Sequence, residues 1–362
     1  MGLAAVEEIR KIDSVTIGLV IGKFWPPHNG HISGIQTAVE SCDRTYVIVC
    51  AAPNSFPSGR VRTMMIQRIF PQAEVILVDD FCAWHLGTPC IADCTPKWAA
   101  RTRELINVQI THVFTSEDYG DDFAAEVGAT HVSIDKGRMS FPISGTEVRR
   151  DIRQNWFNLP RIVRQGLFRK IAVIGSESTG TTTLALDLAK DLSAPCAPEA
   201  GRTISWELFA AAGSMEDVNW TEQIFWDVTN EQANSESVLI SEHLDATPGP
   251  LGPWLVCDTD AVATLVWWDR YLSSDSTQLR HFAYSRLADF YVVTSPEDVN
   301  FSQDGIRDGE DLRLEMHELF IQVARQTGRP VLVARGDRFE RVRQVKTFMT
   351  ELTSTFWTSS ID

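Results

Sequence analysis

The sequence predicts an α/β protein made of two doubly wound parallel-sheet domains. Short apolar, partly β-branched runs alternate along the chain with longer amphipathic stretches, as strands alternate with crossover helices in parallel sheets. In each half, a glycine-containing loop follows the first apolar run and precedes a helical stretch, at residues 22–31 and 175–183. A chain of 362 residues is long enough for two domains. We expect them to span residues 1–157 and 158–362.

The first half contains five apolar runs of strand length. Residues 15–21 (VTIGLVI) are continuous and end in Gly22, as expected of a buried strand. The expected strands are residues 15–21, 45–51, 75–78, 110–115 and 130–134. The expected helices are residues 31–41, 61–70, 97–108 and 123–127.

The second half repeats the alternation after a connector at residues 153–168. Its expected strands are residues 169–174, 254–257, 290–293 and 330–334. Its expected helices are residues 184–192, 220–242, 261–271, 311–327 and 338–353. Two parallel sheets would therefore each present loops at their carboxyl edge, where such sheets bind ligands.

Composition excludes several classes of protein. The net charge of −15 disfavours nonspecific binding to nucleic acid or to a membrane surface. There is no signal-peptide pattern and no apolar run long enough to span a bilayer. Seven cysteines without a secretion signal indicate a reducing compartment, and we expect a cytoplasmic protein. One group, Cys82, His85, Cys90 and Cys94, is either a zinc site or a set of scattered thiols near a loop.

Residues 22–31 (GKFWPPHNGH), which we call the histidine loop, carry the chemistry of a phosphate site. Gly22 permits close backbone approach, and the two prolines stiffen the turn. His28 and His31 are three residues apart, so both side chains can lie on one face of a first helical turn. Together with Lys23 and the helix N-terminus, they can surround anionic oxygens. The loop resembles the (T/H)-x-G-H signature of nucleotidyltransferases, which transfer a nucleoside monophosphate from a nucleoside triphosphate.

A second phosphate-binding pattern follows at residues 141–152 (FPISGTEVRRDI). Ser144 can cap a helix with Glu147 three residues later, and Thr146 and Arg149 lie nearby. The pattern resembles the I-S-x-T-x-x-R signature of the same enzymes. Both signatures occur in the expected order within one domain-sized segment. The first half is therefore expected to be a Rossmann-like nucleotidyltransferase domain.

Residues 175–183 (GSESTGTTT), the glycine loop, lie between an expected strand and helix, which is the context of a P-loop. Gly175 and Gly180 have the P-loop spacing, and Thr182 stands at the position that holds magnesium. Thr181 occupies the position of the P-loop lysine. The backbone N–H groups can still cradle phosphates. The cation that reaches the transferred phosphate is missing, so either Arg202 or Arg307 replaces it or kinase activity is weak or lost.

Further acidic and basic residues lie near expected strand ends of the second half. Glu199 and Arg202 are three residues apart, and Asp258 and Asp260 directly follow an expected strand. A carboxylate at such a strand tip can hold magnesium or accept a proton from a substrate hydroxyl. Arg307 lies in a polar loop that can fold over a nucleotide and neutralise developing charge.

The order of the two signatures and the P-loop-like module resembles one family. This is the bifunctional nicotinamide mononucleotide adenylyltransferase and ribosylnicotinamide kinase family of bacterial NAD salvage, over residues 15–352. Only about 14 residues precede the first expected strand, so we expect no DNA-binding arm and no nucleic-acid partner. The resemblance implies magnesium as the cofactor and ATP as co-substrate. It also implies nicotinamide mononucleotide, nicotinamide riboside and NAD as ligands. A homo-oligomer is left open.

The resemblance also implies roles for individual residues. For adenylyl transfer, the catalytic residues are Lys23, His28, His31 and Arg149. ATP would also contact Gly22, Phe24, Ser116, Glu117, Tyr119, Ser144 and Thr146, and Trp98 would stack on nicotinamide mononucleotide. In the kinase-like domain, nucleoside triphosphate would bind Gly175, Ser176, Glu177, Ser178, Thr179, Gly180, Thr181, Thr182, Thr183 and Arg307. Asp258 would be catalytic there. The riboside would bind Glu199, Arg202, Asp258 and Asp260, with magnesium on Thr182 and Asp258.

Two alternatives stay open. The first signature also fits adenylyl or cytidylyl transfer to pantetheine phosphate, a flavin mononucleotide or a phosphoalcohol; the P-loop-like module favours the nicotinamide substrate. The second module also fits a nucleotide sensor that binds its ligand without turnover, because the lysine position is altered.

Overall fold

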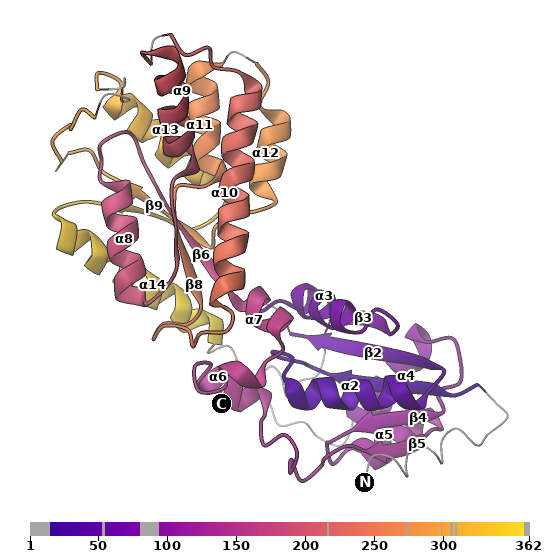
Figure 1. The fold of residues 1–362 in the computed structure, drawn as a ribbon. Coiled ribbons are helices and arrows are strands. Elements are labelled where there is room, and N and C mark those ends of the chain that lie inside the picture. The colour runs from indigo at the N-terminus through magenta and orange to yellow at the C-terminus, as the bar shows by residue number, and fades with distance from the viewer. Residues whose placement is uncertain are drawn as a thin grey trace. The chain divides into compact units, whose positions relative to one another are not determined.

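The protein is seen in a computed structural model that describes residues 15–52, 55–79, 94–215, 217–272, 274–297, 299–304, 307 and 310–357. The backbone forms two compact units: the first comprises the chain up to Leu167 together with the C-terminal segment from Thr353, and the second covers Phe168–Leu352. Each unit is an α/β domain with a five-stranded parallel sheet (Figure 1). The predicted class, two parallel-sheet α/β domains, is therefore confirmed.

The sheet of the first unit has the order β3-β2-β1-β4-β5. Its strands are β1 (Ile17–Gly22), β2 (Arg44–Ala51), β3 (Glu74–Asp79), β4 (His112–Thr115) and β5 (Thr130–Ser133). Its helices are α2 (Asn29–Ser41), α3 (Gly59–Ile69), α4 (Cys94–Leu105), α5 (Gly120–Val127), α6 (Gly145–Arg150) and α7 (Arg161–Leu167), with a 3₁₀ turn, η2, at Trp156–Asn158. All strand pairs are parallel. Chain order reverses between β1 and β4, so the loops after these two strands flank the usual ligand crevice.

Alternating residues of the first sheet build two apolar layers. Val20, Val47 and Phe114 pack with α2 and α3, and Leu19 and Tyr46 pack with α4 and α5. At Gly59 the helix approaches the sheet so closely that an added Cβ would lie 2.2 Å from the Cβ of Ala51. Burial on both faces explains why the central strands β1, β2 and β4 are continuous apolar runs in the sequence.

The sheet of the second unit has the order β10-β9-β6-β8-β7, again parallel throughout. Its strands are β6 (Arg169–Ile174), β7 (Cys196–Ala197), β8 (Trp254–Asp258), β9 (Phe290–Thr294) and β10 (Val331–Ala334). Its helices are α8 (Thr181–Leu192), α9 (Ala200–Ala212), α10 (Glu222–His243), α11 (Ala261–Tyr271), α12 (Thr277–Tyr284), α13 (Arg313–Gln326) and α14 (Arg338–Trp357). Helices α8 and α14 cover one face, and α10 to α13 cover the other (Figure 1).

Several expected boundaries differ from the structure. Helices α2, α3, α4, α5 and α8 begin two or three residues earlier than expected, because residues of the loops themselves form the first helical turn. Helix α7 belongs to the first unit, where an added Cβ at Gly166 would lie 2.3 Å from the Cε of Met65. The boundary between the compact units thus follows Leu167, ten residues later than the expected boundary. Helices α7, α9 and α12 were not expected.

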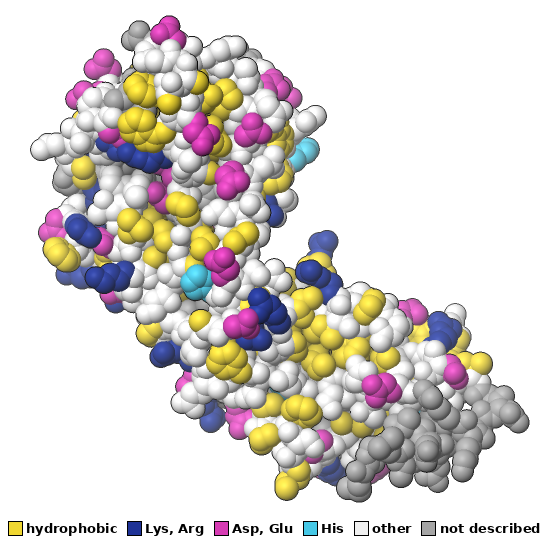
Figure 2. All heavy atoms as spheres, viewed as in Figure 1, with side chains coloured by type: hydrophobic (Ala, Val, Ile, Leu, Met, Phe, Trp, Pro, Cys, Tyr) yellow, Lys and Arg dark blue, Asp and Glu magenta, His cyan; other side chains and the backbone are white. Residues whose placement is uncertain are grey.

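Three remaining expectations concern the surface charge, membrane-spanning helices and the alternative zinc site. On the face drawn in Figure 2, acidic and basic side chains are interspersed rather than segregated. No helix among the described residues is both long and apolar enough to cross a membrane. Cys82, His85 and Cys90 of the alternative zinc site lie outside the described residues, so this alternative stays untested.

Candidate functional site

The histidine loop of the first unit connects β1 to α2 and is held in one conformation by its own side chains. Phe24 has a left-handed backbone (φ 48°) and is buried, and its ring packs edge-to-face with that of His31 at a centroid distance of 5.1 Å. The buried guanidinium of Arg62, on α3, donates one hydrogen bond to the carbonyl of Lys23. It donates another, over 2.8 Å, to the hydroxyl of Ser55. Arg62 therefore ties the loop after β1 to the loop after β2.

The two histidines meet as expected at the start of α2. Their rings stack with a centroid distance of 3.6 Å, and His28 is the N-cap residue of the helix. The backbone N–H of His28 donates to Nδ1 of His31 over 3.3 Å, so the proton of a neutral His31 lies on Nε2. Burial and the charge of Arg138 lower the pKa of His28 to about 4. Burial, the neighbouring His28 and the charge of Arg138 hold the pKa of His31 well below its usual value. Both imidazoles are therefore neutral at pH 7 and present N–H dipoles rather than charges.

The fold brings the second signature against the first. Ser144 caps α6, its hydroxyl oxygen accepting from the N–H of Glu147 over 3.2 Å. Arg149 donates to the carbonyl of Trp25 over 2.7 Å and stacks on the Trp25 ring at 4.3 Å. It also donates to the hydroxyl of Thr146 over 3.1 Å. The two signatures, about 120 residues apart in sequence, thus form one cluster at the carboxyl edge of the sheet.

The loop after β4 carries the residues expected near adenine. Ser116 and Glu117 follow the strand directly, and the N–H of Glu117 donates to the hydroxyl of Thr115 over 2.9 Å. Tyr119 is the N-cap residue of α5. Sequence reasoning missed Arg138, which lies 3.9 Å from Glu117. A basic residue shortly before the second signature was the available signal.

Trp98, which is expected to stack on nicotinamide, packs against the core of the first unit. It lies on α4 and packs, partly buried, against the apolar layer that contains Leu19 and Tyr46. Its stacking on nicotinamide stays a prediction.

The glycine loop of the second unit has the geometry of a phosphate cradle. Ser178 (φ 57°) and Gly180 (φ 83°) are left-handed, and α8 begins at Thr181. When successive residues alternate between right-handed and left-handed backbone conformations, their N–H groups point toward one concave side that can bind an anion. At Gly175 an added Cβ would lie 2.4 Å from the hydroxyl of Thr294, so only glycine fits there.

Asp258, at the end of β8, lies beside Thr181 and Thr182 of the glycine loop. Burial raises the pKa of its carboxyl, while hydrogen bonds from the hydroxyls of Thr182 and Thr181 lower it. Oxygen Oδ1 of Asp258 is buried and has no hydrogen-bond partner among the described residues. A buried carboxylate oxygen beside a threonine hydroxyl suits a hard divalent cation. The residues present therefore fit magnesium.

Of the residues expected to bind the riboside, Glu199 and Arg202 lie within electrostatic reach of Asp258. Burial and the neighbouring charge of Asp258 raise the pKa of Glu199 to about 7, and the charges of Arg202 and Arg307 oppose that rise. Arg202 and Arg307 both form ion pairs with Asp304, the latter over 3.5 Å. Sequence reasoning missed Asp304, whose only signal was its place in the polar loop beside Arg307.

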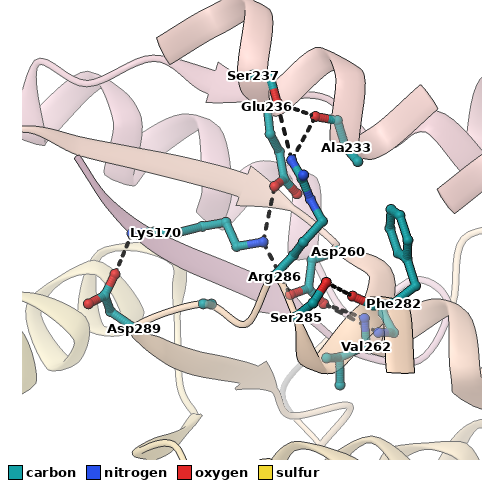
Figure 3. Close-up of polar contacts among 12 residues, drawn as sticks. Lys170, Ala233, Glu236, Ser237, Asp260, Val262, Phe282, Ser285, Arg286 and Asp289 are labelled. Atoms are coloured by element: carbon teal, nitrogen blue, oxygen red, sulfur yellow. Dashed lines mark hydrogen bonds and ion pairs between the residues drawn. The ribbon is translucent and has the colours of Figure 1, made fainter. Parts of the chain in front are cut away.

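Asp260 has its contacts inside the second unit, so the structure gives no support to its expected role in binding the riboside. It is 1% exposed, and its Oδ1 caps α11 by accepting from the N–H of Val262 over 2.9 Å. Its Oδ2 accepts from the hydroxyl of Tyr291 over 3.1 Å and lies 3.7 Å from Nζ of Lys170. Figure 3 shows Lys170 reaching between Asp260 and Glu236. Two residues beyond Asp258 the chain has entered the helix, so this carboxylate faces the interior and stabilises the fold.

Known proteins resemble the chain in sequence and in fold. An AAA domain family matches residues 170–341. The trifunctional NAD biosynthesis/regulator proteins NadR of Escherichia coli and Salmonella typhimurium are 27% and 26% identical over 208 and 202 residues, covering 52% and 51% of this chain. These matches cover 49% of each relative, so the chain spans about half the length of the curated relatives it matches.

Two solved structures share the fold along nearly the entire chain. They are NadR in complex with NAD and AMP-PNP and NadR in complex with NR, each with a TM-score of 0.60 and 20% identity. They cover 96% and 94% of this chain, and the matches include 98% and 97% of the solved chains. The chain is thus NadR-like in sequence over about half its length and in fold over almost all of it, which confirms the resemblance expected from its motifs.

Proposed function

We propose that the first unit is a Rossmann-like nucleotidyltransferase that transfers AMP from ATP to nicotinamide mononucleotide, forming NAD and pyrophosphate. The observation that carries the proposal is the contact of Arg149 with Trp25, which joins the second signature to the histidine loop. NadR relatives described as NAD biosynthesis proteins support the substrate.

The chemistry requires positioning and neutralisation of charge rather than a covalent intermediate. An oxygen of the 5′-phosphate of the mononucleotide attacks the α-phosphorus of ATP. The bond to the oxygen that bridges the α- and β-phosphorus breaks, and pyrophosphate leaves. Neutral His28 and His31 offer N–H donors, and Lys23 and Arg149 offer positive charge where negative charge develops. Ser144 and Thr146 would hold the β- and γ-phosphates at the start of α6.

For the second unit we propose a P-loop-like site that phosphorylates nicotinamide riboside. The riboside hydroxyl would attack the γ-phosphorus of the nucleotide, ADP would leave, and a carboxylate would take the hydroxyl proton. Glu199 suits that proton transfer because its pKa is raised to about 7. Asp258 and Thr182 would hold magnesium, which would neutralise charge on the phosphates. A solved NadR complex with NR supports this ligand.

The first proposal is tested by incubating the protein with ATP, magnesium and nicotinamide mononucleotide and measuring NAD. His31→Ala is expected to retain the fold and lower turnover by about two orders of magnitude or more, the loss typical of removing a donor to the transition state. Gln36→Ala, an exposed change on the same helix, is the matched control. Turnover of His31→Ala equal to that of the control would refute the assignment. Transfer to pantetheine phosphate or a flavin mononucleotide instead would establish another substrate.

The second proposal is tested with ATP, magnesium and nicotinamide riboside, measuring the mononucleotide. Asp258→Asn is expected to abolish phosphorylation, while Asp269→Asn, an exposed change on α11, retains it. Nucleotide binding without any product would favour the sensor. Two observations favour that alternative: Thr181 stands at the lysine position, and Asp304 engages both Arg202 and Arg307.

A further inference from the structure

We infer that Arg313 and Arg341 are positioning residues that supply the glycine loop with the positive charge it lacks at Thr181, by donating hydrogen bonds to its carbonyl oxygens. The inference rests on the proposed nucleotide site of the second unit and deepens it. It concerns how the backbone of the loop binds polyphosphate without a P-loop lysine.

Arg341 of α14 is fixed behind the loop. Its side chain is 4% exposed and donates to three main-chain carbonyls. The donor–acceptor distances are 2.6 Å to Thr179, 2.9 Å to Ser295 and 2.9 Å to Gly336. The planar guanidinium therefore joins three loops at the carboxyl edge of the sheet and has little freedom to turn elsewhere.

Arg313, the first residue of α13, contacts the preceding peptide of the same loop. Its Nη2 donates to the carbonyl of Ser178 over 2.8 Å and to that of Val299 over 2.7 Å. The hydroxyl of Ser178 in turn accepts from the N–H of Ser302 over 2.8 Å. Burial lowers the pKa of Arg313, the charge of Glu310 opposes that shift, and the charges of Arg341 and Arg307 add to it. Arg313 and Arg341 lie near one another because they contact the carbonyls of the neighbouring residues Ser178 and Thr179.

The two arginines bind consecutive peptides of the loop. In a trans peptide the C=O and N–H point in opposite directions, so a cation at the carbonyl leaves the N–H on the other side. The N–H groups of these peptides belong to Thr179 and Gly180. A charged donor on the carbonyl polarises the peptide and strengthens its N–H as a donor. Two polarised N–H groups next to two positive charges, that of buried Arg341 and that of partly buried Arg313, would attract a polyphosphate.

The arrangement has a cost that a bound anion would offset. Like charges lie close together, and the buried Nε–H of Arg313 has no hydrogen-bond partner among the described residues. An unsatisfied buried donor costs about 1–3 kcal/mol. Thr181 contributes only a hydroxyl, which is hydrogen-bonded to Asp258. The positive charge that suits the phosphates therefore comes from Arg313 and Arg341, on the carbonyl side of the loop peptides.

The test measures MgATP binding at the glycine loop in the full chain. Hydrogen exchange with mass spectrometry follows protection of residues 175–192 against MgATP concentration, so binding to the first unit does not contribute. Arg313→Met is expected to raise the half-saturating concentration about tenfold, the loss of one charge-assisted hydrogen bond. Arg313→Lys is expected to raise it less. Arg343→Met, an exposed arginine on α14, is the control and is expected to bind as wild type.

A charge introduced elsewhere in the loop separates this role from a merely structural one. Thr181→Lys, combined with Arg313→Met, is expected to restore binding to within about threefold of wild type, because it replaces the lost charge. Arg341→Met is expected to weaken binding in the same way. If Arg341→Met fails to fold, shown by lost protection in β6, the Arg313 variants alone decide. Wild-type binding by Arg313→Met, or no restoration by Thr181→Lys, would overturn the inference.

The outcomes also separate this inference from the kinase proposal. Protection of wild type that depends on Arg313, without phosphorylation of the riboside, would refute the kinase and support the charge inference. Phosphorylation of the riboside that is unaffected by the arginine substitutions would support the kinase proposal and refute the charge inference. Absence of protection in wild type at saturating MgATP would overturn the charge inference, because the arginines would then fail to make the loop a binding site.

Discussion

The stacked histidines make the stability of the first unit depend on pH, and His28→Gln is the perturbation that isolates this effect. The pKa of His28 is about 4 in the folded protein, against an ordinary value of 6.5. Between these values the unfolded chain binds more protons than the folded one. The contribution of neutral His28 is therefore fully present above pH 6.5 and is lost as the pH falls toward 4.

The size of the effect follows from the two pKa values. Lowering the pH from about 7.5 to about 5 should remove roughly 2 kcal/mol of stability through His28 alone. The group is almost completely buried, with 5% exposure, so solvent screening reduces this figure little. In His28→Gln that share of the pH dependence should disappear, although the unit still responds to its carboxylates.

The assay must report on the first unit separately. Hydrogen exchange of β1 and β2, corrected for the intrinsic pH dependence of exchange, gives the free energy of opening of that core at each pH. His243→Gln, on α10 of the second unit, is the control and should retain the wild-type slope. An NMR titration in which the imidazole of His28 ionises near pH 6.5 would refute the reasoning. So would an equal pH dependence in wild type and His28→Gln.

Three further substitutions test other parts of the structure. Ser144→Ala removes the cap of α6 and should destabilise the first unit by about 1 kcal/mol, measured by hydrogen exchange, and weaken ATP binding there. Asp260→Asn leaves a buried lysine with one carboxylate partner instead of two. It should destabilise the second unit by about 3 kcal/mol while riboside affinity in the remaining folded protein is unchanged; a selective loss of affinity would return Asp260 to the site. Gly175→Ala forces a Cβ to 2.4 Å from the Thr294 hydroxyl and should abolish MgATP protection of the glycine loop, whereas wild-type protection would contradict that close approach.

Much of the local structure could be predicted because it depends on neighbours in sequence. The apolar runs identify the central strands most clearly, since β1, β2 and β4 of the first sheet and β6, β8 and β9 of the second are buried on both faces. The spacing of His28 and His31 places both at the start of one helix, and Ser144 with Glu147 predicts the cap of α6. The helix starts were expected too late because loop residues such as Thr181 also form the first turn.

Other features depend on contacts between distant segments and were not predictable. Asp258 and Asp260 are both acidic and two residues apart, yet one lies beside the glycine loop and the other is inside the fold. The path of the chain into α11 separates them. From the sequence alone, Arg341 looks like a surface residue of an amphipathic helix. In the folded unit it donates to the carbonyl of Thr179 in the glycine loop.

The sequence by itself determined that the chain forms two parallel α/β units, each with a glycine-containing loop after its first strand, because backbone conformation and burial follow from local residue types and spacing. Only the tertiary structure decided the charge state of the histidines, the contact of Arg149 with Trp25 and the cations behind the glycine loop. Those properties arise from desolvation and from the distances between residues up to about 160 positions apart.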